Sequence, residues 1–358
     1  MKVGIIGLPN AGKSTLFNAL TDAGAATAIY PFTTIDPNVG VAVVPDDRLD
    51  RVAEIAGCKR RVPAVVNFVD IAGLVEGASH GEGLGNQFLG HIRDVDAVAY
   101  VIRAFSGQDV PHVLGEINPT SDVEILETEL MLADLSALER AHEKVARQAK
   151  SGDAAVKKEL EAIERVTGKL DQGISARVHV SMEDIELPRD LVLLSAKPAV
   201  FVANVDEEEA TRPDLESLRV LAAQRGGELV VVSAEIEEEM AQLDPAERAE
   251  FSAEMGTAGA LEQLIRACFT LLGLVTFFSV ESDECRAWPI PEGTHAPQAA
   301  GAIHTDMEKS FIKAEVVHCR DLFADGSLSA ARQHGHLLLE GREYVVRDGD
   351  VITFKFGQ

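Results

Sequence analysis

The 358-residue chain has few cysteines, few basic residues and no long apolar stretch. Its cysteines, Cys58, Cys268, Cys285 and Cys319, lie far apart and form no C-x-x-C pair, which excludes a disulfide framework and a zinc ribbon. No apolar run reaches the roughly 18 residues that a membrane-spanning helix needs. No secretory signal precedes the first apolar segment. We therefore expect a soluble protein of the reducing cytoplasm that has no membrane partner.

Acidic side chains outnumber basic ones. The chain has 58 Asp and Glu and 33 Lys and Arg, and its formal net charge is −25. Affinity for duplex DNA comes mainly from cationic side chains that displace counterions from the phosphates. This balance excludes a general DNA-binding protein. The hydrophobic content of 46% supports globular folding, and the length is sufficient for two or three domains, each with its own core.

Short β-branched runs recur along the chain, and segments of helical periodicity separate most of them. Near-continuous apolar strands are typical of a parallel sheet that is buried on both faces. The pattern therefore predicts an open α/β sheet. The predicted strands are residues 3–6, 40–44, 64–69, 97–102, 200–203 and 229–232.

Residues 123–196 interrupt this pattern, because their apolar positions recur at helical spacing. Within them, Ser151-Gly152-Asp153 has the composition of a helix end followed by a new N-cap. The segment predicts an antiparallel helical hairpin inserted between two strands of the sheet.

The region from residue 274 onward predicts a small mixed domain of β-grasp type. Its Asp348-Gly349 pair separates two apolar runs and is a strong β-hairpin signal. The apolar runs are residues 275–280, 311–317, 344–346 and 351–356. The expected domains are thus residues 1–122 with 197–273 for the sheet, 123–196 for the hairpin and 274–358 for the mixed domain.

Residues 7–14, Gly-Leu-Pro-Asn-Ala-Gly-Lys-Ser, match the phosphate-binding loop (P-loop) pattern G-x-x-x-x-G-K-[ST] in full. The match follows the first predicted strand and precedes a helical pattern, which is the context that the motif requires. In that context the backbone N–H groups surround the β-phosphate, Lys13 reaches the β- and γ-phosphates, and the Ser14 hydroxyl ligates Mg²⁺. The sequence therefore predicts a nucleoside-triphosphate site.

Asp70 follows the third predicted strand and begins a D-x-x-G motif that ends at Gly73. A carboxylate at this position can hold Mg²⁺ through water, and the glycine N–H can donate to a γ-phosphate. Between the two motifs, Thr33 and Thr34 lie in a candidate switch loop. We favour Thr34 as the residue that completes the Mg²⁺ shell when a γ-phosphate is present.

The segment Asn204-Val205-Asp206-Glu207 follows the strand 200–203, where P-loop proteins selective for guanine usually carry N-K-x-D. The aspartate of that motif accepts two hydrogen bonds from guanine, whereas adenine offers no N1–H. This chain has Glu207 in place of the aspartate and Val205 in place of the lysine. The pattern therefore weakens the expectation of guanine specificity.

Leu74 follows the D-x-x-G motif, where many switch GTPases have a glutamine that orients the attacking water. Leucine makes no hydrogen bond through its side chain, so another group must place the water. His80, His112, a bound monovalent cation and a partner protein are the alternatives. The Asn10 amide oxygen could help to hold K⁺ beside the β–γ bridge, where positive charge stabilises the developing negative charge.

Six segments together resemble the YchF/Obg-like ATPase family. They are G-L-P-N-A-G-K-S, Y-P-F-T-T-I-D-P-N, D-I-A-G-L-V-E-G-A, G-L-G-N-Q-F-L, N-V-D-E and A-P-Q-A-A-G-A-I-H-T-D-M-E-K-S. The resemblance covers essentially the whole chain. It implies a P-loop NTPase (G-domain-like) sheet, an inserted helical hairpin and a C-terminal TGS domain of β-grasp fold. It further implies Mg²⁺-dependent hydrolysis of ATP in preference to GTP, association with the ribosome or its 50S subunit, and regulation by nucleotide state.

The same resemblance implies roles for individual residues. Asn204 and Val205 would contact the adenine, and Phe105 would lie next to the base. His112 would position the water, which makes His80 the less favoured candidate for that role. The phosphate-binding set would be Asn10, Ala11, Gly12, Lys13, Ser14 and Thr15. The catalytic set would be Lys13, Gly73 and His112, and the metal set Ser14, Thr34 and Asp70. A conventional translation-factor GTPase and a nucleotide-dependent adaptor with incidental hydrolysis stay open as alternatives.

Basic residues are unevenly spread despite the acidic total. One cluster of six lies along the predicted hairpin and one of three in the last domain: Arg140, Lys144, Arg147, Lys150, Lys157 and Lys158, then Lys309, Lys313 and Arg320. Two locally basic surfaces could dock on ribosomal RNA or protein while the acidic body avoids other polyanions. The alternative is that these are ordinary solvated helix faces, since Glu139 and Glu143 lie among them.

Overall fold

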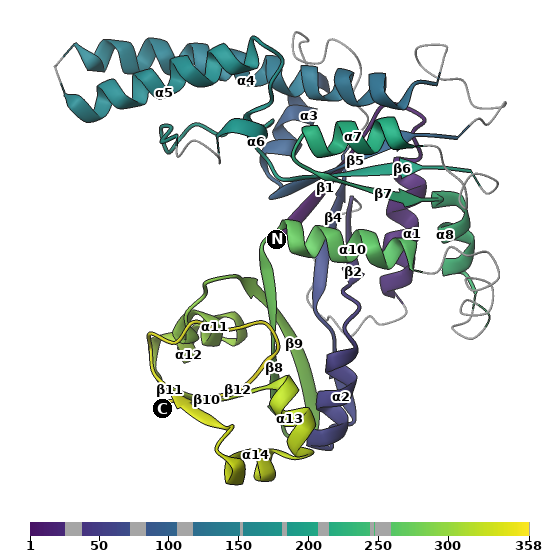
Figure 1. The fold of residues 1–358 in the computed structure, drawn as a ribbon, viewed down its shortest axis with the longest axis vertical. Helices are drawn as coiled ribbons and strands as arrows, with labels where there is room; N and C mark the ends of the chain where they lie inside the picture. Colours follow the sequence, from purple (N-terminus) through teal and green to yellow (C-terminus); the bar gives the residue numbers. More distant parts are fainter. Residues whose placement is uncertain are drawn as a thin grey trace. The chain divides into compact units, whose positions relative to one another are not determined.

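The computed structural model divides the chain into two compact units (Figure 1). It describes residues 1–25, 38–71, 84–105, 117–150, 153–180, 185–206, 215–243, 247 and 259–357. Unit 1 consists of Met1–Ala26, Thr34–Val41 and Asn67–Leu264, and unit 2 of Thr27–Thr33, Ala42–Val66 and Ile265–Gln358. Among the helices in the described ranges, none is both long enough and apolar enough to cross a membrane.

Unit 1 is built on a six-stranded sheet of order β2-β4-β1-β5-β6-β7. The strands are β1 (Lys2–Ile6), β2 (Val39–Val43), β4 (Val65–Asp70), β5 (Ala97–Arg103), β6 (Ala199–Asn204) and β7 (Glu228–Val232). Pairing is parallel from β4 through β1, β5 and β6 to β7. Each of the six runs predicted as a strand forms one, so the predicted open α/β sheet is confirmed.

The centre of this sheet is buried on both faces, as its continuous apolar strands predict. Every residue of β5 and β6 is buried, and Tyr100 stacks on Phe201 with ring centroids 5.0 Å apart. Helix α1 (Lys13–Ala25) packs on β1, α4 (Pro119–Ala149) on β5 and α7 (Glu216–Gln224) on β7. The helices that accompany the sheet along the chain are α1 (Lys13–Ala25), α3 (Leu84–Arg93), α7 (Glu216–Gln224), α8 (Ala234–Ala241) and α10 (Ala260–Leu271).

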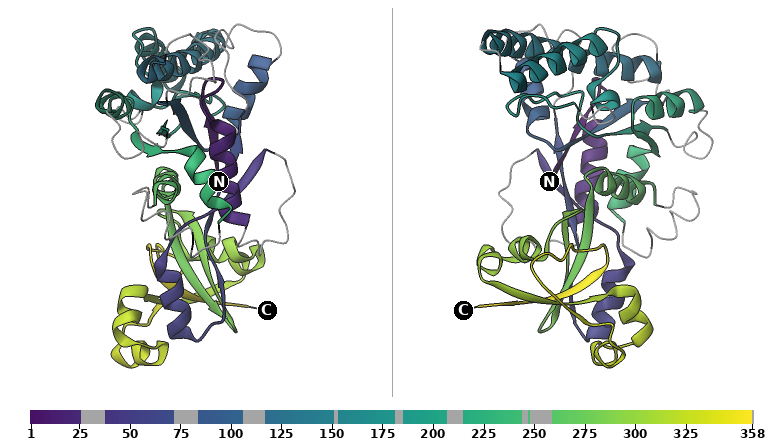
Figure 2. Two further views of the ribbon diagram at one scale, coloured as in Figure 1. Left: turned by 90° about the vertical axis from the view of Figure 1, so that its right-hand side faces the viewer. Right: turned by 60° about the vertical axis from the view of Figure 1, so that its left-hand side comes forward.

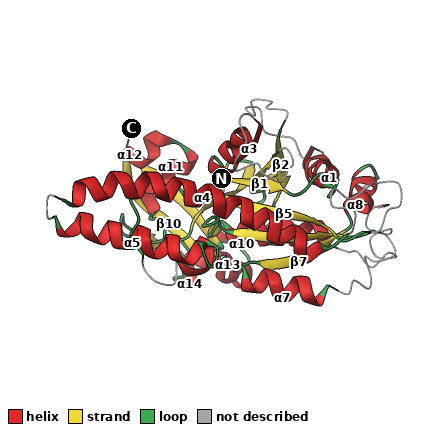
Figure 3. Ribbon diagram, turned by 90° about the horizontal axis from the view of Figure 1, so that it is seen from above, coloured by secondary structure: helices red, strands yellow, loops and turns green. Residues whose placement is uncertain are grey.

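The inserted hairpin consists of α4 (Pro119–Ala149) and α5 (Ala154–Leu170), followed by the short α6 (Ala176–His179). Figure 3 shows α4 and α5 side by side, extending away from the strands of unit 1. Asp153 caps α5 as predicted, because its carboxylate accepts a hydrogen bond from the Ala155 N–H at 2.9 Å. Apolar side chains between the helices, with Leu138 and Ile163 fully buried, hold the hairpin together.

Buried polar groups fix the base of the hairpin. The Asp134 carboxylate on α4 accepts hydrogen bonds from the backbone N–H groups of Leu194 at 2.6 Å and Ser195 at 2.8 Å. Burial raises the pKa of Asp134 to about 6, although these hydrogen bonds oppose the shift. Arg177 on α6 forms a buried ion pair with Glu127 on α4, with 2.6 Å between Nη2 and Oε1. Helix α6 and the C-terminal end of the insertion at residues 194–195 are thus both tied to the N-terminal half of α4.

Unit 2 has a second six-stranded sheet, of order β11-β10-β12-β8-β9-β3. Its strands are β3 (Arg60–Val62), β8 (Leu274–Glu281), β9 (Glu284–Pro291), β10 (Phe311–His318), β11 (Leu338–Glu340) and β12 (Asp350–Phe356). The sheet is mixed, because β12 runs parallel to β8 and antiparallel to β10. The helices of this unit are α2 (Asp47–Ala56), α11 (Ala296–Ile303), α12 (Thr305–Lys309), α13 (Cys319–Asp325) and α14 (Leu328–His334). The mixed sheet agrees with the predicted β-grasp type.

The predicted hairpin between residues 344–346 and 351–356 is wrong. Residues 344–346 are described and form no strand; Val345 makes a single antiparallel bridge to His295. The Asp348-Gly349 turn is instead tied to β8, since the Thr276 N–H donates to Asp348 Oδ1 and the Gly349 N–H donates to the Thr276 carbonyl. β12 therefore pairs with β10 and β8.

Residues 42–66 group with the C-terminal unit, although the sequence-based boundaries placed all of residues 1–122 in the sheet domain. Strand β3 pairs in parallel with β9, and α2 contacts β9 and α13, beside which it lies in Figure 2. The Arg48 guanidinium forms ion pairs with two carboxylates. Its Nη2 lies 2.7 Å from Asp46 Oδ2, and its Nη1 lies 2.5 Å from Asp348 Oδ2. A strand of three residues is too short to carry a periodic signal, so sequence patterns do not indicate this pairing. The three-part division of the chain stays a prediction.

Candidate nucleotide-binding site

The P-loop connects β1 to α1, which Figure 1 labels. Two of its glycines are required by the close approach of other atoms. A Cβ atom on Gly7 would lie 2.4 Å from the Val101 carbonyl oxygen. A Cβ atom on Gly12 would lie 2.1 Å from Asn204 Nδ2, and the φ of Gly12 is +88°. Only glycine fits at either position without a shift of the Val101 backbone or of the Asn204 side chain.

Lys13 is the first residue of α1 and is 8% exposed. Its ammonium group donates a hydrogen bond to the Leu8 carbonyl oxygen at 3.0 Å. Burial lowers the pKa of Lys13, and the nearby Asp70 carboxylate opposes that shift. The first N–H groups of a helix lack intrahelical acceptors and create positive potential, so Lys13, Ser14 and Thr15 begin a helix suited to phosphate.

Asn10 and Ala11 form the middle of the loop. Asn10 has a φ of +64°, a left-handed conformation that asparagine tolerates better than most residues. The Ala11 N–H donates to the Leu8 carbonyl at 3.3 Å. The loop backbone is therefore held in a defined curve before α1 begins.

Ser14 and Asp70 bring two hard oxygen donors together. The Ser14 hydroxyl donates to Asp70 Oδ2 at 3.1 Å. Asp70 Oδ1 is buried and has no hydrogen-bond partner among the described residues. Hydroxyl and carboxylate oxygens are the ligands that Mg²⁺ prefers, so this donor set fits that ion.

Asn204 ends β6 and joins the P-loop to the start of α8. Its Nδ2 donates to the Ala11 carbonyl at 3.0 Å, and its Oδ1 accepts from the Ala234 N–H at 2.9 Å. Both polar ends of this buried amide are thus used to hold two loops in place, a positioning role beyond the base contact that the resemblance implies. Val205 is buried beside it, and its N–H donates to the Val232 carbonyl at 3.0 Å.

Phe105 lies just beyond β5 and is half-buried. The Arg103 guanidinium lies over its ring, with 4.5 Å from Cζ to the ring centroid, and Arg103 Nε donates to the Phe105 carbonyl at 3.3 Å. Sequence reasoning missed Arg103, although a charged residue at the end of an otherwise apolar run was an available signal. The Ala104 N–H donates to the Asn204 carbonyl at 2.8 Å, so Phe105 and Asn204 follow adjacent, paired strands.

The predicted site residues in the described part of the chain lie close together. They end or follow strands β1, β4, β5 and β6, whose carboxyl ends lie at one edge of a parallel sheet. Four other predicted positions, Thr34, Gly73, His80 and His112, lie outside the described residues. The described part of the site can bind a triphosphate through the loop and Lys13, and a divalent ion through Ser14 and Asp70.

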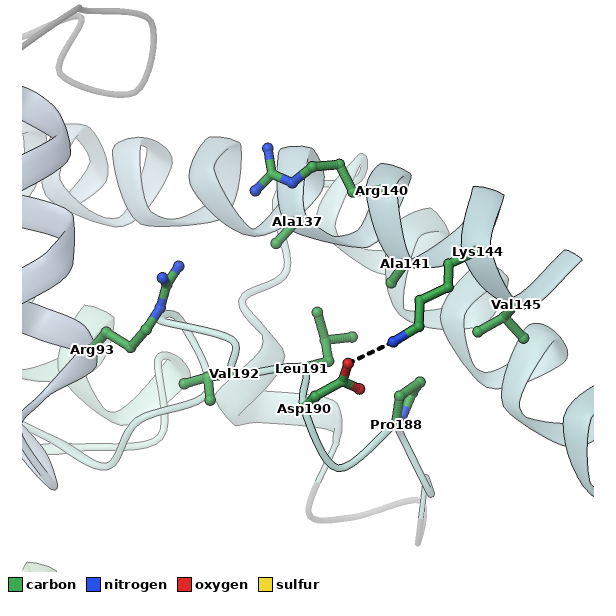
Figure 4. Close-up of a pocket in the computed structure, with 10 residues that line it drawn as sticks. All are labelled: Arg93, Ala137, Arg140, Ala141, Lys144, Val145, Pro188, Asp190, Leu191 and Val192. Atoms are coloured by element: carbon green, nitrogen blue, oxygen red, sulfur yellow. Dashed lines mark hydrogen bonds and ion pairs between the residues drawn. The ribbon is translucent and has the colours of Figure 1, made fainter. Parts of the chain in front are cut away.

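A second polar site lies at the base of the hairpin (Figure 4). It is a groove of about 310 Å³ between α4 and residues 188–192, into which Arg93 of α3 also reaches. Lys144 donates to Asp190 at 2.7 Å, and this hydrogen bond lowers the pKa of Asp190. Arg140 and Lys144 belong to the predicted basic cluster, whereas Arg93 comes from a different helix and was missed.

The fold and the site define a P-loop NTPase with a GTPase-type domain. Residues 2–129 match a family model described as "50S ribosome-binding GTPase". Residues 274–357 match the model of the YchF GTPase C-terminal region, described as "Protein of unknown function (DUF933)". The chain belongs to the YchF family, which confirms the resemblance stated from its motifs.

Relatives match along the full chain. Proteins of Bacillus subtilis (strain 168) and Escherichia coli O157:H7, both named "Ribosome-binding ATPase YchF", are each 46% identical to this chain, with 99% of both sequences covered. The solved structure of the Schizosaccharomyces pombe YchF GTPase is 36% identical and superimposes with a TM-score of 0.89, covering 99% of this chain and 97% of that one.

Proposed function

We propose that this protein is a cytoplasmic, Mg²⁺-dependent ATPase that prefers ATP to GTP, binds the ribosome or its large subunit, and regulates this association through its nucleotide state. One observation carries the proposal. Lys13, Ser14 and Asp70 lie together at one edge of a parallel sheet, in a chain that is 46% identical over 99% of its length to proteins named ribosome-binding ATPases.

The residues of the P-loop act by binding and orienting the triphosphate. The N–H groups from Asn10 to Thr15 face the phosphates, and the Lys13 ammonium supplies positive charge where negative charge develops during phosphoryl transfer. Ser14 and Asp70 would hold Mg²⁺, with Thr34 as a further proposed ligand. The ion, when bound, would neutralise phosphate charge.

Two proposed catalytic groups lie outside the described residues. The Gly73 N–H would donate to the γ-phosphate, and His112 would place the attacking water, since the Leu74 side chain makes no hydrogen bond. The hydrogen bonds of Asn204 hold the P-loop against the start of α8, so the phosphate-binding loop itself is braced.

The preference for ATP rests on the surroundings proposed for the base. Val205 stands where guanine-selective proteins usually have lysine, and it is buried among apolar residues. Phe105, half-buried just beyond β5, offers apolar contact to a purine ring. The Val205 side chain has no polar group to bind guanine, and Glu207 replaces the aspartate that accepts the two guanine hydrogen bonds.

A GTPase is the second candidate, because the matched family model and the S. pombe structure carry that name. Isothermal titration of the full chain with ATP and with GTP, each with Mg²⁺, separates the two. We expect a lower Kd for ATP. Tight GTP binding with undetectable ATP binding would refute the ATPase proposal.

Ribosome association is tested by co-sedimentation with ribosomes and with isolated large subunits. The runs are made with ATP, with ADP and without nucleotide, using wild type and Lys13→Ala. We expect pelleting of the wild type to depend on the nucleotide, and the variant to lose that dependence because it no longer holds the γ-phosphate. Identical pelleting of the wild type in all three conditions contradicts regulation by nucleotide state.

A further inference from the structure

Unit 2 contains a cluster of ligand-type side chains that the nucleotide site does not use. Asp325, His334 and His336 present one ligand atom each, and these atoms all lie within 4.8 Å of one another. His334 Nδ1 lies 2.7 Å from Asp325 Oδ1, and His336 Nδ1 lies 2.7 Å from Asp325 Oδ2. Two imidazole nitrogens therefore converge on the two oxygens of one carboxylate.

Backbone structure fixes the three residues in this arrangement. Asp325 is the last residue of α13, and Gly326 closes that helix through its N–H to the Leu322 carbonyl at 2.9 Å. His334 is the last residue of α14. The cluster thus joins the ends of two helices of unit 2.

The turn after α14 brings the second histidine to the same side as the first. Gly335 has a φ of +81°, which reverses the chain immediately after His334. The His336 N–H then donates to the Ala331 carbonyl at 2.9 Å. Because that hydrogen bond is part of the helix end, the spacing of the two imidazoles is set by the backbone.

The cluster has a buried side and an open side. The Asp325 side chain is 5% exposed, whereas those of His334 and His336 are 59% and 45% exposed. The carboxylate is therefore a fixed anchor, and the imidazoles are free to turn toward or away from a bound ion.

We propose that Asp325, His334 and His336 form a binding site for a divalent transition metal of the Zn²⁺ type, with three protein ligands and a fourth position open to solvent. Two imidazole nitrogens and one carboxylate oxygen are a donor set for such an ion, whereas Mg²⁺ takes oxygen ligands. The site is therefore chemically distinct from the Ser14 and Asp70 pair.

The imidazoles must turn for the ion to enter. Metal–ligand distances of about 2.0 to 2.2 Å in a tetrahedral site place neighbouring ligand atoms about 3.3 to 3.6 Å apart. The two nitrogen–oxygen distances of 2.7 Å must therefore lengthen by less than an ångström, and any wider separation within the 4.8 Å limit must shorten, both through rotation of the exposed imidazoles. The bound metal would link the end of α13 to the end of α14.

The test is titration of the full chain with ZnCl₂ in excess Mg²⁺ and without nucleotide. We expect one Zn²⁺ site in the wild type that His334→Gln and His336→Gln each weaken by at least about tenfold. His304→Gln is the matched control, because His304 is an exposed histidine of the same unit whose Nδ1 lies 3.5 Å from Asp306, outside the cluster. The control should bind Zn²⁺ as the wild type does.

Spectroscopy with Co²⁺ in place of Zn²⁺ gives a second readout. We expect the visible absorption of a tetrahedral Co²⁺ complex in the wild type and its loss in the double variant His334→Gln/His336→Gln. Both substitutions are at exposed positions, so the variant should stay folded, and circular dichroism checks this. Equal Zn²⁺ stoichiometry and Kd in the wild type and the double variant would overturn the proposal, as would a wild type that binds no Zn²⁺.

Discussion

The two sheets of this protein gather polar side chains in different ways. In the parallel sheet of unit 1, residues far apart in sequence, such as Ser14, Asp70 and Asn204, follow strand ends at one common edge. The mixed sheet of unit 2 has no such edge, and its candidate metal ligands, Asp325 and His334, lie at helix ends instead. A parallel sheet thus creates a site through its topology, whereas a mixed sheet leaves that to the connecting segments.

The units also differ in how the chain supplies them. The central strands of unit 1 are long and apolar. Unit 2 takes a three-residue strand and one helix from residues 42–66, more than two hundred positions before the rest of its sheet. Removal of the chain after residue 273 would therefore also strip α2 and β3 of their partners, and single substitutions compare the units more cleanly than truncation does.

The largest expected effect is on ATP hydrolysis in unit 1, with no change in the proposed Zn²⁺ binding in unit 2. Lys13→Ala removes the ammonium group proposed to face the phosphates, and ATP hydrolysis should fall roughly 10³-fold, or about 4 kcal/mol. Zn²⁺ binding by the Asp325 cluster should not change. Lys355→Ala, a half-exposed lysine of unit 2 that lies 3.5 Å from Glu315, is the control and should hydrolyse ATP at the wild-type rate. Unchanged hydrolysis in Lys13→Ala would mean that the assigned site is wrong.

The second effect concerns a buried carboxylate in unit 1. Burial raises the pKa of Asp134 from 3.8 to about 6, so the native state binds a proton in a pH window where the unfolded chain has released it. The stabilisation from this proton is complete below about pH 3.8 and is lost as the pH rises through 6. The stability advantage of wild type over Asp134→Asn should therefore shrink by up to roughly 3 kcal/mol between those limits.

Urea titrations followed by helical circular dichroism, at pH values on either side of this window, measure the difference. Leu126→Ala, a buried apolar change on the same helix, serves as the control, because its cost should not depend on the titration of Asp134. A stability difference between wild type and Asp134→Asn that stays constant across the window would show that the native pKa of Asp134 is not raised.

Unit 1 was largely predictable from sequence because its signals are local. The P-loop lies between a strand and a helix, the strands are continuous apolar runs, and Asp153 precedes α5 as an N-cap does. The bracing role of Asn204 was not predictable, because both of its partners are backbone groups, of Ala11 and Ala234. Every residue type offers the same backbone carbonyl, and every type except proline the same N–H, so the sequence does not indicate which backbone groups Asn204 contacts.

Unit 2 was less predictable because its topology depends on distant contacts. The Asp348-Gly349 turn has local hairpin chemistry, but its hydrogen bonds go to Thr276 on β8. Likewise, β3 becomes a strand only through its pairing with β9. In both places a tertiary contact outweighs the local signal, which is the usual reason that such predictions fail.

The third effect tests whether residues 42–66 are integral to unit 2. Arg48 contacts Asp46 and Asp348, its side chain is one-third exposed, and its guanidinium lies 5.6 Å from the Phe278 ring. Arg48→Ala leaves two carboxylates without their cation and should lower the free energy of unfolding of unit 2 by about 2 kcal/mol.

Fluorescence of Trp288, the single tryptophan of the chain, reports on this unit during denaturation. Trp288 donates to Ser279 at 2.9 Å within the same sheet. Arg320→Ala is the control, because the side chain of Arg320 is 81% exposed and its pair with Asp321 should contribute less than about 1 kcal/mol. Equal midpoints for Arg48→Ala and wild type would show that the 42–66 segment contributes little to unit 2.

The fourth effect distinguishes a docking surface from an ordinary solvated helix face. Reversal of charge in Arg140→Glu/Lys144→Glu, within the groove of Figure 4, should weaken ribosome co-sedimentation about tenfold, or about 1.4 kcal/mol, and most strongly at low salt. Lys150→Glu/Lys157→Glu makes the same charge change on the hairpin at two exposed lysines that do not line the groove. Equal loss in both variants would indicate general electrostatics rather than a groove-specific contact.

The smallest effect concerns Asn10, whose φ of +64° holds it in the centre of the P-loop. If its amide oxygen helps to hold K⁺ beside the β–γ bridge, ATP hydrolysis should rise roughly threefold when Na⁺ is replaced by K⁺, or about 0.6 kcal/mol. Asn10→Gly retains the left-handed backbone and removes the amide, so it should abolish the difference between the two salts while leaving the loop intact. Equal wild-type rates in Na⁺ and K⁺ would exclude this role for Asn10 and shift the stabilisation of the transition state to Lys13 and the proposed His112.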